Sequence, residues 1–110
     1  MLSYDEFMQV KMRVGKIIEV KDFKEAKKPA YQLRIDFGKK MGVKKSSAQL
    51  AKTYSSEELL GRQIVAVTNF PPKQIGPFIS EVLVLGVVLD DGRVPLLAVD
   101  EEVPLGLRVL

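Results

Sequence analysis

Apolar and polar residues alternate strictly between positions 31 and 37 of the chain. The apolar positions are Tyr31, Leu33, Ile35 and Phe37. Because successive side chains of a strand point to opposite faces of a sheet, this alternation predicts a strand with one buried face.

Five other segments are predicted to be strands from their β-branched content or from the turns that bound them. They are residues 12–20, 43–50, 64–70, 80–89 and 94–99. The apolar phase of the first shifts near Gly15 and Lys16, which predicts a β-bulge or a sharp bend there. Pro71 and Pro72 must end the strand before them, since proline cannot donate to a ladder. The sequence Asp90-Asp91-Gly92 predicts a hairpin turn between the last two strands.

Two short helices are predicted from capping signals. Residues 1–10 contain Ser3 followed three positions later by Glu6, and Ser55 is followed in the same way by Glu58. This serine–glutamate spacing is that of a capping box, in which each side chain binds the other residue's backbone N–H. Gly61 is placed to end the second helix.

The order of these elements indicates an all-β fold with minor helices. A single small helix after the third strand is the arrangement of the five-stranded Greek-key oligonucleotide-binding (OB) barrel. The alternative is a β-sandwich, which usually needs about seven strands. The length of 110 residues suits one domain, so residues 1–110 are predicted to form a single barrel.

The charge of the chain is unevenly distributed. Residues 11–52 contain 13 Lys and Arg against 4 Asp and Glu, a net charge of +9, whereas the chain as a whole carries +3. Such a basic segment is either a solvated face or a surface that binds a polyanion.

Several classes of chemistry are disfavoured by composition. The chain has no cysteine and no histidine, so thiolate catalysis, zinc–thiolate sites and the commonest general base are excluded. No phosphate-binding glycine loop, nucleophile elbow or paired-carboxylate motif is present. The acidic runs Asp90-Asp91 and Asp100-Glu101-Glu102 suit a turn and a solvated loop better than a metal site. The sequence therefore predicts a protein that is not an enzyme and has no cofactor or metal.

No apolar run approaches the roughly 20 residues of a membrane-spanning helix, and the first residues lack the basic-then-apolar pattern of a signal peptide. We therefore expect no membrane insertion. The absence of cysteine agrees with a cytoplasmic location.

The polar segment 43–50 is one candidate binding surface. Lys45, Ser47 and Gln49 would share one face of a strand, where a lysine with a hydroxyl and an amide can hold a phosphate and recognise a base or a sugar hydroxyl. The alternative is a solvated outer strand.

The loop at residues 69–78 is a second candidate. It combines Phe70 and Phe78 with Lys73 and Gln74, and aromatics in such a loop can stack on bases or bind apolar peptide side chains. The alternative is that both phenylalanines close one end of the core.

The two ends of the chain predict a homodimer. Residues 1–10 and 103–110 hold nine apolar residues that a small barrel cannot cover by itself, and such terminal patches usually mark an interface. The residues are Leu2, Phe7, Met8, Val10, Val103, Leu105, Leu107, Val109 and Leu110.

From Arg13 to Gly86 the chain resembles the tRNA-binding domain family, which includes the C-terminal domain of bacterial methionyl-tRNA synthetase. The matching stretches are Arg13–Ile17, Ser47-Ala48, Glu57–Arg62, Asn69–Lys73 and Ser80-Glu81. Further stretches resemble the CsaA branch of that family, described as export-related chaperones. They are Ala26–Tyr31, Ile35–Gly38, Lys44–Gln49 and Asn69–Pro72.

The resemblance implies an OB barrel that forms a homodimer through its terminal segments. It implies tRNA binding, as in the broader family, or binding of unfolded preproteins in cooperation with the secretion machinery, as in the CsaA branch. The family's binding-face residues correspond here to Ser47, Asn69, Lys73, Ser80 and Glu81. We expect Lys45 to join them, so that residues from three separate segments converge on one face.

The chain departs from many tRNA-binding members in the same region. Gln74-Ile75-Gly76-Pro77 replaces a basic, methionine-containing loop, Val82-Leu83 replaces a Gly-Met pair, and Ala48 replaces a glycine. The loop is less basic and more apolar, which favours a peptide ligand over tRNA.

Overall fold

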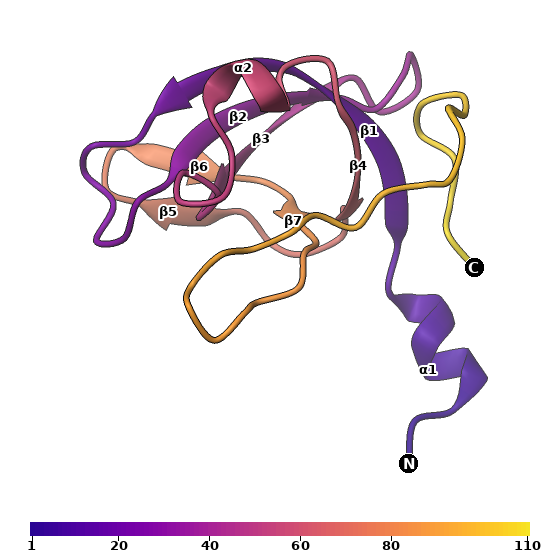
Figure 1. The fold of residues 1–110 in the computed structure, drawn as a ribbon. Helices are drawn as coiled ribbons and strands as arrows, with labels where there is room; N and C mark the ends of the chain where they lie inside the picture. Colours follow the sequence, from indigo (N-terminus) through magenta and orange to yellow (C-terminus); the bar gives the residue numbers. More distant parts are fainter.

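Strand β1 (Met12–Asp22) is the longest element, and most of the sheet is assembled along it. The computed structural model describes all 110 residues. β1 pairs antiparallel with β4 (Gln63–Val67) along its first half and with β2 (Tyr31–Asp36) along its second half. A strand that changes partners midway must bend, and Figure 1 shows β1 curving across the sheet.

The sheet has the strand order β3-β2-β1-β4-β7, where β3 is Val43–Ala48 and β7 is Leu83–Val84. β5 (Lys73–Ile75) and β6 (Phe78–Ser80) form a separate hairpin. The chain after β6 returns to the free edge of β3, where the backbone N–H groups of Glu81 and Val82 donate to the carbonyl of Lys45 at 2.8 and 3.3 Å. The five-stranded antiparallel sheet is therefore nearly closed into a barrel, as the predicted OB-type fold requires (Figure 1).

The core lies inside this barrel, and its strongest contributor is the alternating segment predicted first. Leu33 and Ile35 are fully buried, as is Phe37 just beyond the end of β2. Ile17 and Ile64 meet them from β1 and β4. The polar residues between them face outward, so the alternation determined which face of β2 is inside.

The predicted bulge at Gly15 and Lys16 is wrong in position. The register of β1 against β2 shifts between Ile17 and Glu19 instead. Gly15 has a different role: a Cβ there would lie 2.6 Å from Cγ2 of Ile35 and 2.7 Å from the ring of Phe37. The glycine permits core side chains to approach the backbone of β1.

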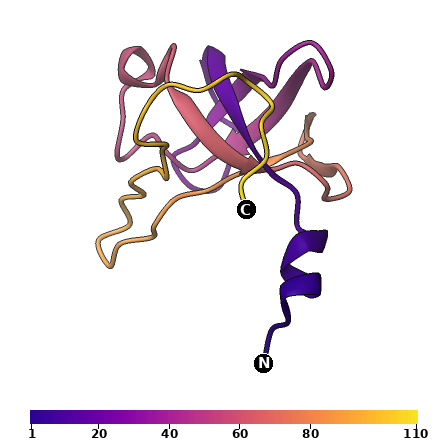
Figure 2. The ribbon, with the colours of Figure 1, turned by 90° about the vertical axis from the view of Figure 1, so that its right-hand side faces the viewer.

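Both predicted helices are confirmed with their capping boxes. α1 (Tyr4–Gln9) begins after Ser3, and α2 (Ser56–Leu59) begins after Ser55. α2 buries Leu59 against the barrel, whereas α1 has no buried residue. Figures 1 and 2 both show α1 projecting away from the barrel as an arm.

The predicted strands at 80–89 and 94–99 are largely wrong, because only β7 forms there. Residues 85–97 form an irregular hairpin with one ladder bridge, between Gly86 and Leu96. Pro95 has no N–H for a ladder, which limits regular pairing. The predicted turn is confirmed, since the N–H of Leu89 donates to the carbonyl of Arg93 across it.

Other strand boundaries also differ from the prediction. β4 ends at Val67, three residues before Phe70, and β3 ends at Ala48. The segment 69–78, predicted as a loop, contains β5 and the start of β6 around a turn at Gly76, whose φ of +58° suits glycine.

The apolar tail at the C-terminus covers the free edge of β1. The N–H of Gly106 donates to the carbonyl of Val14 at 2.8 Å, and the N–H of Val109 donates to that of Met12 at 2.9 Å. Figure 2 shows this tail crossing beside the root of the α1 arm.

Candidate ligand-binding groove

Two adjoining cavities form a groove where the β5–β6 hairpin meets β7. One cavity of about 360 Å³ lies between Phe70 and Leu83, and a second of about 430 Å³ continues beneath the hairpin 85–97. They share Lys73, Ser80, Val82 and Leu83. We call this continuous hollow the β5–β7 groove. Its other lining residues are Ser47–Leu50, Phe70, Pro71, Ile75, Glu81, Val84–Gly86, Val88, Val94 and Leu96.

One wall of the β5–β7 groove is held by side chains that complete the edge of β3. The hydroxyl of Ser80 accepts the N–H of Ser47 at 3.0 Å, and Oε1 of Glu81 accepts the N–H of Lys45 at 3.0 Å. These acceptors are needed because β3 has no regular partner strand on this side. Ser80 and Glu81 therefore line the groove and also close the barrel.

The two phenylalanines of the segment 69–78 have different environments. Phe78 is half-buried and packs against Phe23, with ring centroids 5.5 Å apart. Phe70 is 54% exposed at the groove. Phe78 thus packs against another aromatic ring and lies outside the main core cluster, while Phe70 offers free apolar surface.

A smaller, charged hollow lies on the outer face of β1, β2 and β3. It has a volume of about 220 Å³ and is lined by Lys21, Arg34, Lys45 and Phe78, with Glu19 among them. The ammonium group of Lys45 lies 5.4 Å from the ring centroid of Phe78, within the range of a cation–π contact. Glu19 lies 3.5 Å from Lys21 and 3.4 Å from Arg34, so one carboxylate faces two of the three cations.

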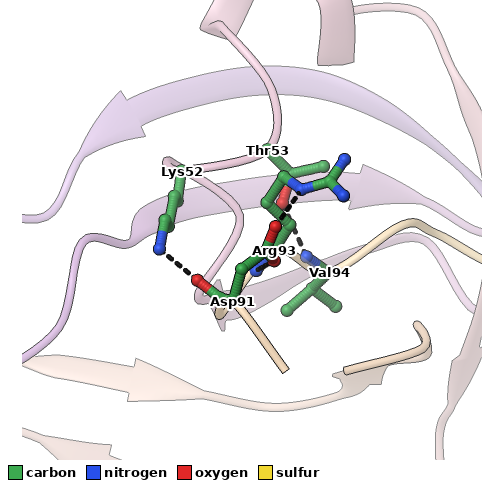
Figure 3. Close-up of polar contacts among 5 residues, drawn as sticks. All are labelled: Lys52, Thr53, Asp91, Arg93 and Val94. Atoms are coloured by element: carbon green, nitrogen blue, oxygen red, sulfur yellow. Dashed lines mark hydrogen bonds and ion pairs between the residues drawn. The ribbon is translucent and has the colours of Figure 1, made fainter. Parts of the chain in front are cut away.

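The hairpin 85–97 that covers the second cavity is attached to the segment after β3. Thr53 Oγ1 accepts the N–H of Val94 at 2.6 Å, and Lys52 donates to the carbonyl of Asp91 (Figure 3). The hydroxyl of Tyr54 accepts the N–H of Leu96 at 3.1 Å. At the tip, the backbone N–H and then the guanidinium of Arg93 lower the pKa of Asp91.

The structure places six of the nine predicted site residues around the β5–β7 groove. They are Ser47, Gln49, Phe70, Lys73, Ser80 and Glu81. Lys45 and Phe78 line the charged hollow instead. Lys45 and Ser47 are two positions apart on β3 and share one face as predicted, but their side chains line different hollows.

Asn69 lies apart from both surfaces. Its side-chain amide binds the segment between α1 and β1, accepting from the N–H of Lys11 at 3.0 Å and donating to the carbonyl of Gln9 at 2.7 Å. The expected convergence on one face is thus met by Ser47, Lys73 and Ser80 but not by Lys45 or Asn69.

The apolar wall of the groove was not predicted, because Leu83, Leu85, Val88 and Leu96 lie in segments predicted as regular strands. The signal available was the pair Gly86 and Pro95. Gly86 permits the close approach of Val94 and Pro95, and Pro95 has no N–H for a ladder.

No group of three or more Asp and Glu residues lies close enough to hold a metal ion. No helix of the structure has the length and apolarity needed to cross a membrane.

Comparisons with known proteins agree with the fold. Residues 12–108 match the model of the putative tRNA binding domain, which describes a binding domain and not a catalytic one. Methionine–tRNA ligase of Thermococcus kodakarensis is 42% identical over 98% of the chain. The chain corresponds to only 14% of the length of that ligase.

Solved structures of chaperones match over the whole chain. The chaperone CsaA of Bacillus anthracis has 47% identity and a TM-score of 0.94, covering 100% of this chain and 99% of its own. The CsaA chaperone protein of Picrophilus torridus has 53% identity and a TM-score of 0.92, covering 100% of both chains. The chain therefore belongs to the tRNA-binding domain family, with the sequence and structure of its CsaA-type members.

Proposed function

We propose that this protein is a non-enzymatic, homodimeric chaperone of the cytoplasm that binds unfolded preproteins in the β5–β7 groove and assists their export with the secretion machinery. The CsaA chaperones to which it is similar support the polypeptide ligand. The homodimer would carry two grooves, and two weak sites on one extended polypeptide gain affinity through effective concentration.

The observation that carries this proposal is the chemistry of the groove lining. Phe70 and Leu83 are about half exposed at its mouth, and ten of the fifteen residues lining the second cavity are hydrophobic. Lys73 and Gln49 supply polar contacts at the margin. A surface of this kind binds apolar side chains of an extended chain, because burying them releases water from both partners.

The alternative function is tRNA binding, and a separate observation supports it. The charged hollow on the outer face of β1–β3 places Lys45 over the ring of Phe78, with Lys21 and Arg34 nearby. Cations with an exposed aromatic edge suit a phosphate backbone and a stacked base. The match to the putative tRNA binding domain supports this alternative equally.

Two sets of variants separate these functions. Phe70→Ala should weaken binding of an unfolded polypeptide about tenfold, since a buried aromatic contributes roughly 1.5–3 kcal/mol and Phe70 is already half-buried. Its matched control is Ile79→Ala, which removes an exposed apolar side chain outside the groove lining. The affinity for the unfolded polypeptide, measured by fluorescence anisotropy, should vary little with salt concentration.

Arg34→Gln combined with Lys45→Gln should weaken tRNA binding and reduce its salt dependence, with little effect on polypeptide binding. Lys39→Gln combined with Lys40→Gln removes the same charge from a turn away from the hollow and is the control. If the Arg34/Lys45 variant abolished polypeptide binding while Phe70→Ala left it intact, the groove proposal would be wrong and tRNA binding would take its place.

A further inference from the structure

Asn69 has no free polar atom in its side chain. Nδ2 donates to the carbonyl of Gln9 at 2.7 Å, and Oδ1 accepts the N–H of Lys11 at 3.0 Å. Next to it, the hydroxyl and the N–H of Thr68 also bind Lys11, both at its carbonyl. Asn69 is therefore bound to the point where α1 joins β1.

α1 cannot satisfy its own C-terminal end. The last four carbonyls of a helix have no partner within it, and the last turn of α1 has no basic residue. With six residues and no buried side chain, α1 also lacks the length and packing that stabilise a helix.

Two side chains from distant parts of the chain donate to these carbonyls. Asn69 donates to Gln9 from the segment after β4, and Nη2 of Arg108 donates to the carbonyl of Met8 from the C-terminal tail. Arg108 also brings a positive charge to the negative end of the helix dipole. The donors reach α1 from two separate segments.

We propose that Asn69 and Arg108 together form a cap that orders α1 and fixes its direction, and that Asn69 is a positioning residue of the arm and not a ligand contact. Both polar atoms of the Asn69 amide are engaged by the segment between α1 and β1, which assigns the side chain to the arm. The arm so directed presents Met1, Leu2 and Tyr4, each more than two-thirds exposed, to a second copy of the chain.

This cap also links the arm to the β5–β7 groove. Phe70 and Pro71, which follow Asn69 directly, line the groove mouth. One residue thus anchors the arm where the groove wall begins. The contact of the arm with a second copy of the chain rests on the proposed homodimer, whereas the ordering of α1 by the cap does not.

Distances between spin labels test the ordering of the arm directly. The chain has no cysteine, so Asp5→Cys with Glu57→Cys places one label on α1 and one on α2. The labelled protein is diluted into excess unlabelled protein, so that only distances within one chain are measured. We expect a narrow distribution of distances between the two labels in the otherwise unmodified protein and a broad distribution in Asn69→Ala. Gln74→Ala, which removes an amide that binds only Gly76, is the matched control and should leave it narrow.

Asn69→Asp is a second variant of nearly the same shape. It keeps an acceptor for Lys11 but places an oxygen opposite the carbonyl of Gln9. The amide proton of Lys11 should therefore stay protected, while that of Val10, which caps α1 by donating to the carbonyl of Phe7, exchanges faster. Loss of one hydrogen bond of this kind predicts a change of up to about tenfold. Unchanged label distances in both variants would overturn the proposal.

Binding measurements separate a positioning role from ligand contact. Asn69→Ala should weaken self-association about tenfold and leave the affinity for one short apolar peptide unchanged. Reduced peptide affinity with a narrow label distribution would instead make Asn69 a ligand contact and overturn the inference. A chain that is monomeric at every concentration would refute the proposed homodimer, and the label distances would still decide the role of the cap.

Discussion

At the scale of single residues, two side chains that line the groove also close the barrel. Ser80 and Glu81 accept the N–H groups of Ser47 and Lys45 along an edge without a partner strand. Substitutions there test stability and ligand binding together, so the two must be measured separately.

Glu81→Ala should lower the free energy of unfolding by about 1.5 kcal/mol, because the half-buried N–H of Lys45 loses a charged acceptor. Glu81→Gln keeps an oxygen at the same position and should lose less than half of that amount. Urea denaturation followed by circular dichroism measures both. Equal losses in the two variants would mean that the hydrogen bond is not what Glu81 contributes.

Gly15→Ala should destabilise the protein by about 1–3 kcal/mol, since its Cβ would overlap Ile35 and Phe37 inside the core. Gly61→Asn is the comparison: no atom lies within 4 Å of the new Cβ, and asparagine tolerates the positive φ of 84°. Urea midpoints should differ clearly between the two variants. Similar midpoints would mean that the core adjusts around position 15.

At the scale of elements, local capping and tertiary contacts stabilise different parts. α2 is defined by its own capping box and by the buried Leu59. The hairpin 85–97 has one ladder bridge and depends on donors and acceptors from residues 52–54 (Figure 3). Substitutions in the capping box should therefore affect α2, and substitutions at residues 52–54 should affect the hairpin.

Thr53→Val should loosen the hairpin, because the N–H of Val94 loses its acceptor while the shape of the side chain is kept. We expect a loss of about 1–2 kcal/mol and faster amide exchange at Val94. Thr53→Ser retains the hydroxyl and should behave as the unmodified protein. Unchanged exchange in Thr53→Val would show that the Thr53 hydroxyl does not hold the hairpin.

The capping box of α2 predicts a pH dependence. The backbone N–H and then the hydroxyl of Ser55 lower the pKa of Glu58 below its ordinary value of 4.5. A carboxyl whose pKa is lower when folded stabilises the fold above its unfolded pKa and loses this contribution as pH falls through the folded pKa. Thermal midpoints of Glu58→Gln should fall less steeply with acid below about pH 4.5 than those of the unmodified protein. If the thermal midpoints of Glu58→Gln and the unmodified protein fell in parallel with pH, Glu58 would not be the source of this pH dependence.

At the scale of the whole molecule, charge and apolar surface are arranged on different sides. The charged hollow lies outside β1–β3, and the groove lies between the β5–β6 hairpin and β7. The apolar arm projects from the barrel (Figures 1 and 2). The proposed ligand binding and self-association would therefore use different residues, so variants can test them independently.

Leu2→Asp combined with Tyr4→Asp should convert the proposed dimer to a monomer without changing the barrel. Both side chains are about 70% exposed, and neither belongs to the capping box of α1. Light scattering across micromolar concentrations measures the mass, and circular dichroism checks the fold. The control is Ile79→Asp, an exposed apolar position on β6. A dimer that survived the double substitution would place the interface elsewhere.

The sequence by itself determined the elements whose residues interact locally. The alternation at residues 31–37 identified the buried face of β2, and the serine–glutamate spacing located both helices. Side-chain periodicity and capping act between residues a few positions apart, so they are readable without the fold. The order of the elements was then enough to predict the barrel.

Only the tertiary structure decided which side chains meet. Asn69 was predicted at the ligand but binds the arm, and Lys45 and Phe78 line a different hollow from the groove. Residues 80–99 had the composition of two strands, yet residues 85–97 form an irregular hairpin beside a cavity. These outcomes depend on hydrogen bonds and packing between residues far apart in the chain, and no local pattern specifies such partners.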